Sequence, residues 1–127
     1  MASDGGPERV SNPARPPPGT VLVPLAELPE PGAKGFMFRD GEALFFGFVV
    51  RAKGTVRGFI DRCPHAGLPL ALAPDRFLTR EGDAILCASH GALFDLTGLC
   101  IGGPCAGQRL WDWPVRVEAG EVVTAEG

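Results

Sequence analysis

Short apolar segments, separated by turns that contain glycine, make up the middle of the chain. The longest of them, Ala43–Val50, is rich in phenylalanine and valine, which favours a strand over a helix. Asp40-Gly41 comes before this segment and Lys53-Gly54 comes after it, and both pairs are typical of tight turns between strands. The flanking apolar segments are residues 36–38 and 56–60. The pattern therefore predicts consecutive antiparallel strands.

The rest of the chain continues this alternation of short strands and turns. Residues 77–79 and 84–86 flank the turn Glu81-Gly82-Asp83, and residues 115–117 precede the turn Ala119-Gly120. Several short strands with a turn signal every ~8–12 residues are typical of a β-sandwich or a barrel. We therefore predict an all-β protein.

Residues 1–19 differ from the rest of the chain in composition. They contain five prolines and few side chains that a core could bury. We predict a disordered or extended tail here, with Pro16–Pro18 biased towards polyproline II, and one folded domain at residues 20–127. A chain of 127 residues has the ordinary size of a single domain.

The charge and hydropathy of the chain argue against several classes of protein. A net charge of −3 and a pI near 5.3 do not favour binding to nucleic acid or to an anionic membrane. Residues 1–9 have neither the basic nor the apolar region of a secretory signal, and no apolar run approaches the ~20 residues of a membrane span. We therefore expect a soluble cytoplasmic protein. Its four cysteines are then better candidates for metal ligands than for disulfides.

Two short motifs combine cysteine with histidine. Cys63-Pro64-His65 is followed, after residues 66–86, by Cys87-Ala88-Ser89-His90, and these motifs contain the only two histidines of the chain. Two thiolates and two imidazoles on loops with glycine and proline are donors suited to a metal centre. On the donors alone, a structural Cys2His2 zinc site in a zinc-stabilised interaction module is also allowed.

The residues around these motifs resemble the Rieske [2Fe–2S] family. The resemblance covers the flanking sequences CPHAG-PL and HGA-FD and continues into Gly102-Gly103-Pro104, where the family has a Gly-Pro loop over its cluster. A zinc site does not explain these flanks. The resemblance implies a [2Fe–2S] cluster in an antiparallel β-sandwich, with a small cluster-binding subdomain at about residues 61–107.

The same resemblance implies which residues bind the cluster. Cys63 and Cys87 would bind the inner iron, while His65 and His90 would bind the outer iron near solvent.

Two features separate this chain from the respiratory members of the family. Those members have an additional cysteine in each ligand loop, whereas this chain has Leu68 and Leu93 in the corresponding regions. The chain also has no tyrosine that could donate to a ligand sulfur, and fewer donors lower the reduction potential. The resemblance is therefore to ferredoxin-type and oxygenase-type members.

We therefore expect a soluble one-electron carrier, a Rieske-type ferredoxin, that passes electrons from a reductase to an oxygenase or a similar acceptor. It would not be the catalytic subunit, because Rieske oxygenases bind a further mononuclear iron through two histidines and a carboxylate, and the cluster uses both histidines here. The alternative within the family is a small subunit of a larger, nitrite-reductase-like enzyme. Redox partners would dock near His65, His90, Leu68, Pro69 and Pro104.

The remaining cysteines, Cys100 and Cys105, have no histidine nearby in the sequence. We interpret them as small, buried and reduced apolar residues rather than as a disulfide. They would then be dispensable for the cluster.

Overall fold

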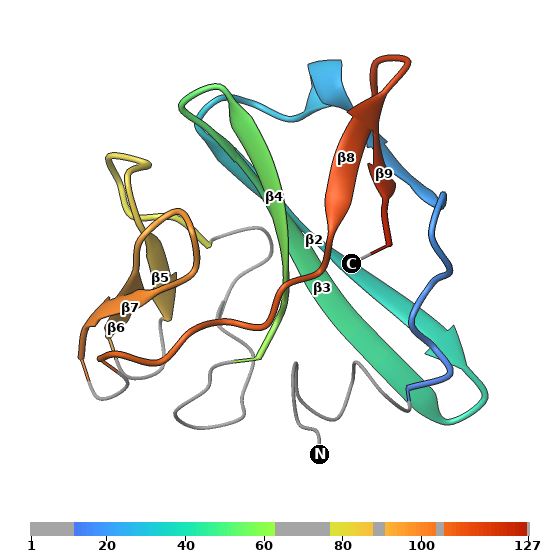
Figure 1. The fold of residues 1–127 in the computed structure, drawn as a ribbon, viewed down its shortest axis with the longest axis horizontal. Coiled ribbons are helices and arrows are strands. Elements are labelled where there is room, and N and C mark those ends of the chain that lie inside the picture. Colours follow the sequence, from blue (N-terminus) through green and yellow to red (C-terminus); the bar gives the residue numbers. More distant parts are fainter. Residues whose placement is uncertain (1–11, 63–76, 88–90, 104–105, 127) are drawn as a thin grey trace.

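The computed structural model describes residues 12–62, 77–87, 91–103 and 106–126 of the chain. Their strands form three antiparallel sheets with the strand orders β1-β9-β8, β2-β3-β4 and β5-β6-β7 (Figure 1). A short 3₁₀ helix, η1 (Leu25–Glu27), follows the first strand. The strands are β1 (Val21–Pro24), β2 (Gly32–Asp40), β3 (Ala43–Ala52), β4 (Thr55–Ile60), β5 (Ile85–Cys87), β6 (Ala92–Phe94), β7 (Cys100–Gly102), β8 (Val115–Glu118) and β9 (Glu121–Thr124). This arrangement confirms the predicted all-β class.

The central sheet, β2-β3-β4, follows the two hairpins that the turn residues predict. Asp40 of β2 pairs with Ala43 of β3, so the connecting turn consists of Gly41 and Glu42, one residue later than Asp40-Gly41. Gly41 has a φ of +62°, a conformation that glycine adopts without a steric penalty. The second turn, Lys53-Gly54, joins β3 to β4 as predicted. Two tight turns thus keep three long strands in one antiparallel sheet.

The central sheet has a hydrophobic core on each face. One core contains Phe48 and Phe59 together with residues of β5, β6 and β7. The other core contains Phe45 and Val49 together with residues of β1 and β9. Because both faces are covered, successive residues of β3 are buried, and its apolar pattern is nearly continuous instead of alternating. The sheet β1-β9-β8 packs on one face of the central sheet and completes the predicted sandwich. The sheet β5-β6-β7 covers the opposite face of the central sheet.

Trp113 attaches the segment before β8 to the central sheet. Its side chain is 1% exposed and lies against Gly47, where a Cβ atom would collide with the indole ring. Its backbone N–H donates to the carbonyl of Gly58 at 3.0 Å, at a position where a Cβ atom would meet the Trp113 carbonyl oxygen. Two glycines therefore let the largest buried side chain, and the segment that carries it, approach the central sheet closely.

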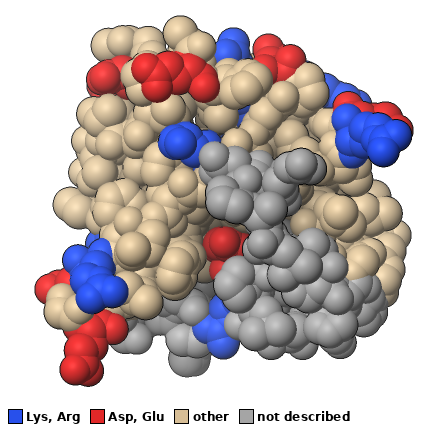
Figure 2. All heavy atoms as spheres, turned by 180° about the vertical axis from the view of Figure 1, so that it is seen from behind, with Lys and Arg blue, Asp and Glu red and all other residues tan. Residues whose placement is uncertain are grey.

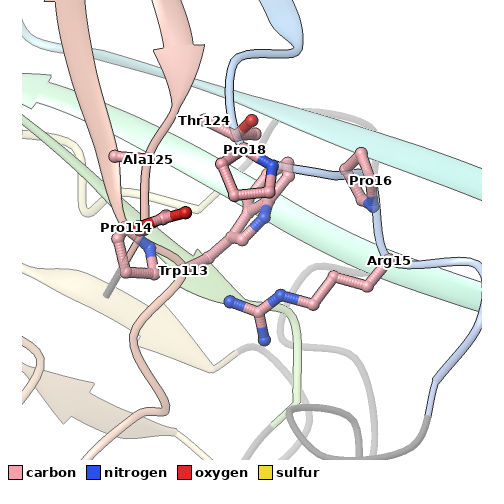
Figure 3. A pocket seen from close by; sticks show the side chains of 8 residues that line it. Arg15, Pro16, Pro18, Trp113, Pro114, Thr124 and Ala125 are labelled. Carbon is pink, nitrogen blue, oxygen red and sulfur yellow. The ribbon is translucent and has the colours of Figure 1, made fainter.

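Residues 12–19 form an irregular stretch that contacts the sandwich. Ala14 is buried in the same core as Phe45, and the Arg15 guanidinium lies over the Phe45 ring, 5.7 Å from its centroid. The hydroxyl of Thr124 donates to the carbonyl of Pro17 at 2.8 Å. A pocket of about 240 Å³ lies between this stretch and the segments that carry Trp113 and Thr124 (Figure 3). The domain boundary at residue 20 stays a prediction.

Charged side chains of both signs lie close together on the surface (Figure 2). Arg116 and Glu118 form an exposed ion pair at 3.1 Å, and Arg51 and Glu30 form a partly buried ion pair at 3.6 Å. Arg51 also donates to backbone carbonyls of the η1 segment, so this pair connects that segment to β3. The part of the chain that the structure describes contains no helix that is long and apolar enough to cross a membrane.

Candidate metal centre

Of the four predicted ligands, the structure describes one. Cys87 is the last residue of β5, whereas Cys63, His65 and His90 lie outside the described residues. The same holds for three residues of the predicted docking surface, Leu68, Pro69 and Pro104. The described residues on either side of these segments show how the fold attaches each ligand motif to the sheets.

The residues on both sides of the first motif are attached to β3. Before the motif, the N–H of Asp61 donates to the carbonyl of Phe46 at 2.9 Å. After it, the ring of Phe77 stacks on Phe48, with the ring centroids 4.2 Å apart and 2° between the ring planes. Phe46 and Phe48 are two residues apart on β3. Both ends of segment 63–76 are therefore anchored at neighbouring positions of one strand.

The second motif connects two paired strands. Cys87 of β5 pairs with Ala92 of β6, and the N–H of Gly91 donates to the carbonyl of Cys87 at 2.9 Å. Cys87 is 0% exposed and lies in the same core as Ile85 and Phe94. A thiolate in apolar surroundings is costly unless a cation or a metal ion accompanies it. The position of Cys87 therefore fits the deep, cysteine-bound side of an iron–sulfur cluster.

The segment after β7 lies against Gly91 and Ala92, the two residues that directly follow the second motif. Gly103 has a φ of +92°, and a Cβ atom there would lie 2.8 Å from the Cα of Ala92 and 3.3 Å from the carbonyl oxygen of Gly91. Only glycine allows so close an approach in this backbone conformation. The structure thus places Gly103, in the described part of the loop that the sequence predicted to cover the cluster, against the residues that directly follow the second motif.

The turn between β6 and β7 is built around the carboxylate of Asp95. Its Oδ1 accepts hydrogen bonds from the Thr97 N–H at 2.9 Å, the Thr97 hydroxyl at 2.6 Å and the Leu99 N–H at 3.1 Å. The Thr97 hydroxyl is the main cause that lowers the pKa of Asp95; desolvation opposes it, while both backbone N–H groups and the charge of Arg109 add to it. The sequence marked Asp95 only as part of HGA-FD, because aspartate is also an ordinary turn residue.

Cys100, on β7, is buried as predicted. Its side chain lies in the core that also contains Cys87, and its thiol donates to the carbonyl of Gly102 at 3.3 Å. Cys105 lies outside the described residues. The interpretation of these two cysteines as a reduced pair stays a prediction.

The chain matches one protein family over most of its length. The match is to the Rieske [2Fe–2S] domain and covers residues 20–121, a range that includes both cysteine–histidine motifs and the segment after β7. The donor set fits this family's cluster, because two cysteines and two histidines are the ligands that distinguish a Rieske centre from a four-cysteine cluster.

Individual relatives include both ferredoxins and oxygenases. The ferredoxin of carbazole 1,9a-dioxygenase from Nocardioides aromaticivorans IC177 is 25% identical to this chain, with a TM-score of 0.65, and the match covers 87% of this chain and 98% of that one. A chain in a complex of reduced oxygenase and oxidized ferredoxin of carbazole 1,9a-dioxygenase is 24% identical, with a TM-score of 0.63, over 83% of this chain and 90% of that one. The oxygenase component of chloroacetanilide N-alkylformylase from Rhizorhabdus wittichii (strain DC-6 / KACC 16600) is 38% identical over 68 residues, 54% of this chain. The chain spans only 15% of the length of that oxygenase component.

Proposed function

This chain belongs to the Rieske [2Fe–2S] family, and we propose that it passes single electrons from a reductase to the oxygenase component of a Rieske oxygenase system. The observation that carries the proposal is the match to a ferredoxin over 98% of that protein's length. The family and the fold confirm the predicted all-β class and the predicted [2Fe–2S] cofactor. The match to a ferredoxin supports the electron-carrier role that the sequence indicated.

We assign the four predicted ligands to two different irons. Cys63 and Cys87 bind the inner iron, and His65 and His90 bind the outer one. The complete burial of Cys87 supports the inner position of the thiolates. When bound, a cluster with two thiolates and two neutral imidazoles has no net charge in its oxidised state, so it accepts one electron more readily than a four-cysteine cluster does. The protein contributes a dry environment for the thiolate side, because Cys87 packs among the apolar residues of the core below β5 and β6.

An oxygenase is the proposed acceptor because the related ferredoxin belongs to a dioxygenase, and another related chain lies in a complex of oxygenase and ferredoxin. The docking surface would consist of His65 and His90 with the apolar side chains around them, Leu68, Pro69 and Pro104. A redox contact has to dissociate quickly, so the interface should bury less than ~1,200 Å² in total. We also propose a cytoplasmic location, following the composition of the chain.

The first experiment measures the cofactor of the purified protein. We expect a red-brown protein with about two irons and two acid-labile sulfides per chain and, after reduction, a Rieske-type EPR signal. A stoichiometric amount of zinc with no visible absorption in aerobically purified protein would show that the cysteine–histidine motifs bind zinc instead.

The second experiment tests the ligands by substitution. Cys63→Ser, His65→Ala, Cys87→Ser and His90→Ala should each abolish the visible absorption and the EPR signal. Cys100→Ala is the matched control, because Cys100 is buried in the same core as Cys87 but is not assigned to the cluster. It should retain the spectrum of the wild type. Loss of the cluster in this control would show that Cys100 had been wrongly excluded.

The third experiment tests docking at the histidine-bound iron. Leu68→Glu should slow electron transfer to an oxidised Rieske oxygenase, measured by stopped-flow mixing, while the EPR spectrum and the midpoint potential stay almost unchanged. Val117→Glu is the control, because Val117 is 45% exposed and its strand, β8, belongs to the sheet on the side away from β5-β6-β7 (Figure 1). An unchanged transfer rate in Leu68→Glu would place the docking surface elsewhere.

A further inference from the structure

We propose that Asp95 is a positioning residue for the cluster: its carboxylate holds the β6–β7 turn in the conformation that keeps Gly103 against Gly91 and Ala92, the two residues that directly follow the second ligand motif. The inference rests on the proposed function, because it concerns the environment of the cluster that the two motifs bind. It assigns a role to a side chain that lies five residues after His90 and is not itself a ligand.

The first step of the argument is the hydrogen bonding of the turn. A single oxygen of Asp95 accepts three hydrogen bonds, two from Thr97 and one from the Leu99 N–H. The backbone of Asp95 adds two more, because its N–H donates to the Leu99 carbonyl at 2.8 Å and its carbonyl accepts from the Gly98 N–H at 3.0 Å. One residue therefore joins the end of β6 to the residue that immediately precedes β7. Hydrogen bonds to a charged acceptor are stronger than those between neutral groups.

The second step is the attachment of this turn to the rest of the protein. A Cβ atom on Gly98 would lie 2.7 Å from the ring of Phe59, so the turn rests on the core side of β4. The N–H of Leu110 donates to the Gly98 carbonyl, and the guanidinium of Arg109 donates to the Thr97 carbonyl, each at 2.8 Å. The turn between β6 and β7 therefore connects the sheet β5-β6-β7 to the central sheet. Asp95 determines the backbone conformation of this turn.

The third step connects the turn to residues 102–103, the described part of the loop that the sequence predicted to cover the cluster. Strand β7 has three residues, and its pairing with β6 consists of Phe94–Cys100 and Leu93–Gly102 with an irregularity between them. So short and irregular a pairing specifies the register weakly, and the register then depends on the turn. Three residues after Cys100, Gly103 fits closely against Ala92. A change in the turn would therefore move Gly103 away from Gly91 and Ala92, which directly follow the second motif.

The competing explanation is that Asp95 only stabilises a surface turn. The chain offers a matched control for this explanation, because the turn before β5 contains a similar pair in which the Thr79 hydroxyl donates to Asp83 at 3.0 Å. That turn is also attached to the sheet β5-β6-β7, through the bridge between Leu78 and Ile85 of β5. Removal of the Asp83 carboxylate should affect global stability without changing the loop beside the second motif.

The experiment compares Asp95→Ala, Asp95→Asn and Asp83→Ala in protein that contains its full complement of iron and sulfide. The measurements are the rate of cluster loss to an iron chelator, followed by visible absorption, and the line shape of the EPR signal. For Asp95→Ala we expect a rate about tenfold faster than in the wild type, which corresponds to about 1.4 kcal/mol. We also expect a broadened EPR signal. Asp95→Asn keeps a side-chain oxygen acceptor and should stay close to the wild type, as should Asp83→Ala.

Two results would overturn the proposal. One is wild-type cluster loss and line shape in fully loaded Asp95→Ala, whatever its stability to denaturant; the other is an equal acceleration in Asp83→Ala. If Asp95→Ala does not accumulate, Arg109→Gln removes the bond to the Thr97 carbonyl and should accelerate cluster loss to a smaller extent. A wild-type rate in that variant would also contradict the proposal. If the purified wild-type protein contains no iron and sulfide, this result contradicts the proposed function. It then also contradicts the inference about Asp95, which rests on that function.

Discussion

Phe77, the first described residue after the first ligand motif, stacks parallel on Phe48 in the middle of β3. Both side chains are nearly inaccessible to solvent, with exposures of 3% for Phe77 and 0% for Phe48. The same core contains Cys87 at the end of β5. The Phe77–Phe48 pair therefore attaches the chain that follows the first ligand motif to the core in which Cys87, the proposed ligand from the second motif, is buried.

Truncation of this pair should be costly. We expect Phe77→Ala to lower the free energy of unfolding by about 3–5 kcal/mol, since it leaves a large cavity against Phe48. Phe46→Ala is the control, because Phe46 lies on β3 two residues before Phe48 but is 41% exposed, and it should cost less than about 1.5 kcal/mol. Denaturant unfolding of the two variants measures the difference. Equal losses would contradict the anchoring role of Phe77.

Gly103 should be intolerant of even a methyl group. In Gly103→Ala the new Cβ atom would collide with the backbone of Ala92, so Gly103 would have to move away from the residues that directly follow the second motif. Gly107→Ala provides the control, because Gly107 has nearly the same φ, +90° against +92°, but nothing lies within 4 Å of its Cβ position. The backbone penalty is common to both variants, about 1 kcal/mol or more. We therefore expect faster cluster loss in Gly103→Ala than in Gly107→Ala, and equal rates would count against a close contact.

The carboxylate of Asp95 should make stability depend on pH in the acid range. Its hydrogen bonds, chiefly the one from the Thr97 hydroxyl, lower the pKa in the folded protein, so Asp95 in the unfolded chain binds its proton more tightly. The stabilisation is therefore fully present above the unfolded pKa, about 3.9, and is lost as the pH falls through the lower folded pKa. Asp95→Asn does not titrate at this position. The difference in unfolding free energy between wild type and this variant should shrink below about pH 4. Parallel pH profiles would contradict the prediction.

The midpoint potential should lie near the low end of the range of Rieske clusters, around −150 mV. The chain has no tyrosine, and Leu68 and Leu93 lie where the respiratory members have their additional cysteines, so the donors that raise the potential in those members are missing. Protein-film voltammetry or a redox titration followed by EPR measures this value. A potential above about +100 mV would mean that other donors to the sulfurs compensate.

Local sequence was sufficient to predict most of the strands. Apolar segments with β-branched and aromatic residues become β2, β3 and β4, and the turns at Lys53-Gly54 and Ala119-Gly120 have the positive φ values that such turns require. The first hairpin turn was displaced by one residue, because the pairing of Asp40 with Ala43 depends on the register of the two strands. Register depends on packing along both strands, which a dipeptide does not report.

The proposed ligands could also be identified from the sequence, because binding a cluster requires particular residue types and their spacing identified the family. Cys63, His65, Cys87 and His90 were predicted in this way, and their assignment as ligands stays a prediction within the region that the family match covers. The role proposed for Asp95 could not be predicted from the sequence, because it depends on how the turn packs on the central sheet. In the folded turn, Asp95 interacts with Thr97, Leu99 and Arg109.

The sequence by itself determined the class of fold and the family, since these follow from local periodicity and from the chemistry of individual side chains. Only the tertiary structure decided which residues meet across the sheets. It placed Gly103 against Ala92 and Phe77 on Phe48, and it attached Thr20 to Thr124 across 104 residues of chain. Such contacts join segments far apart in the sequence, and their stability comes from the collective packing of three sheets around two cores. No local pattern specifies them.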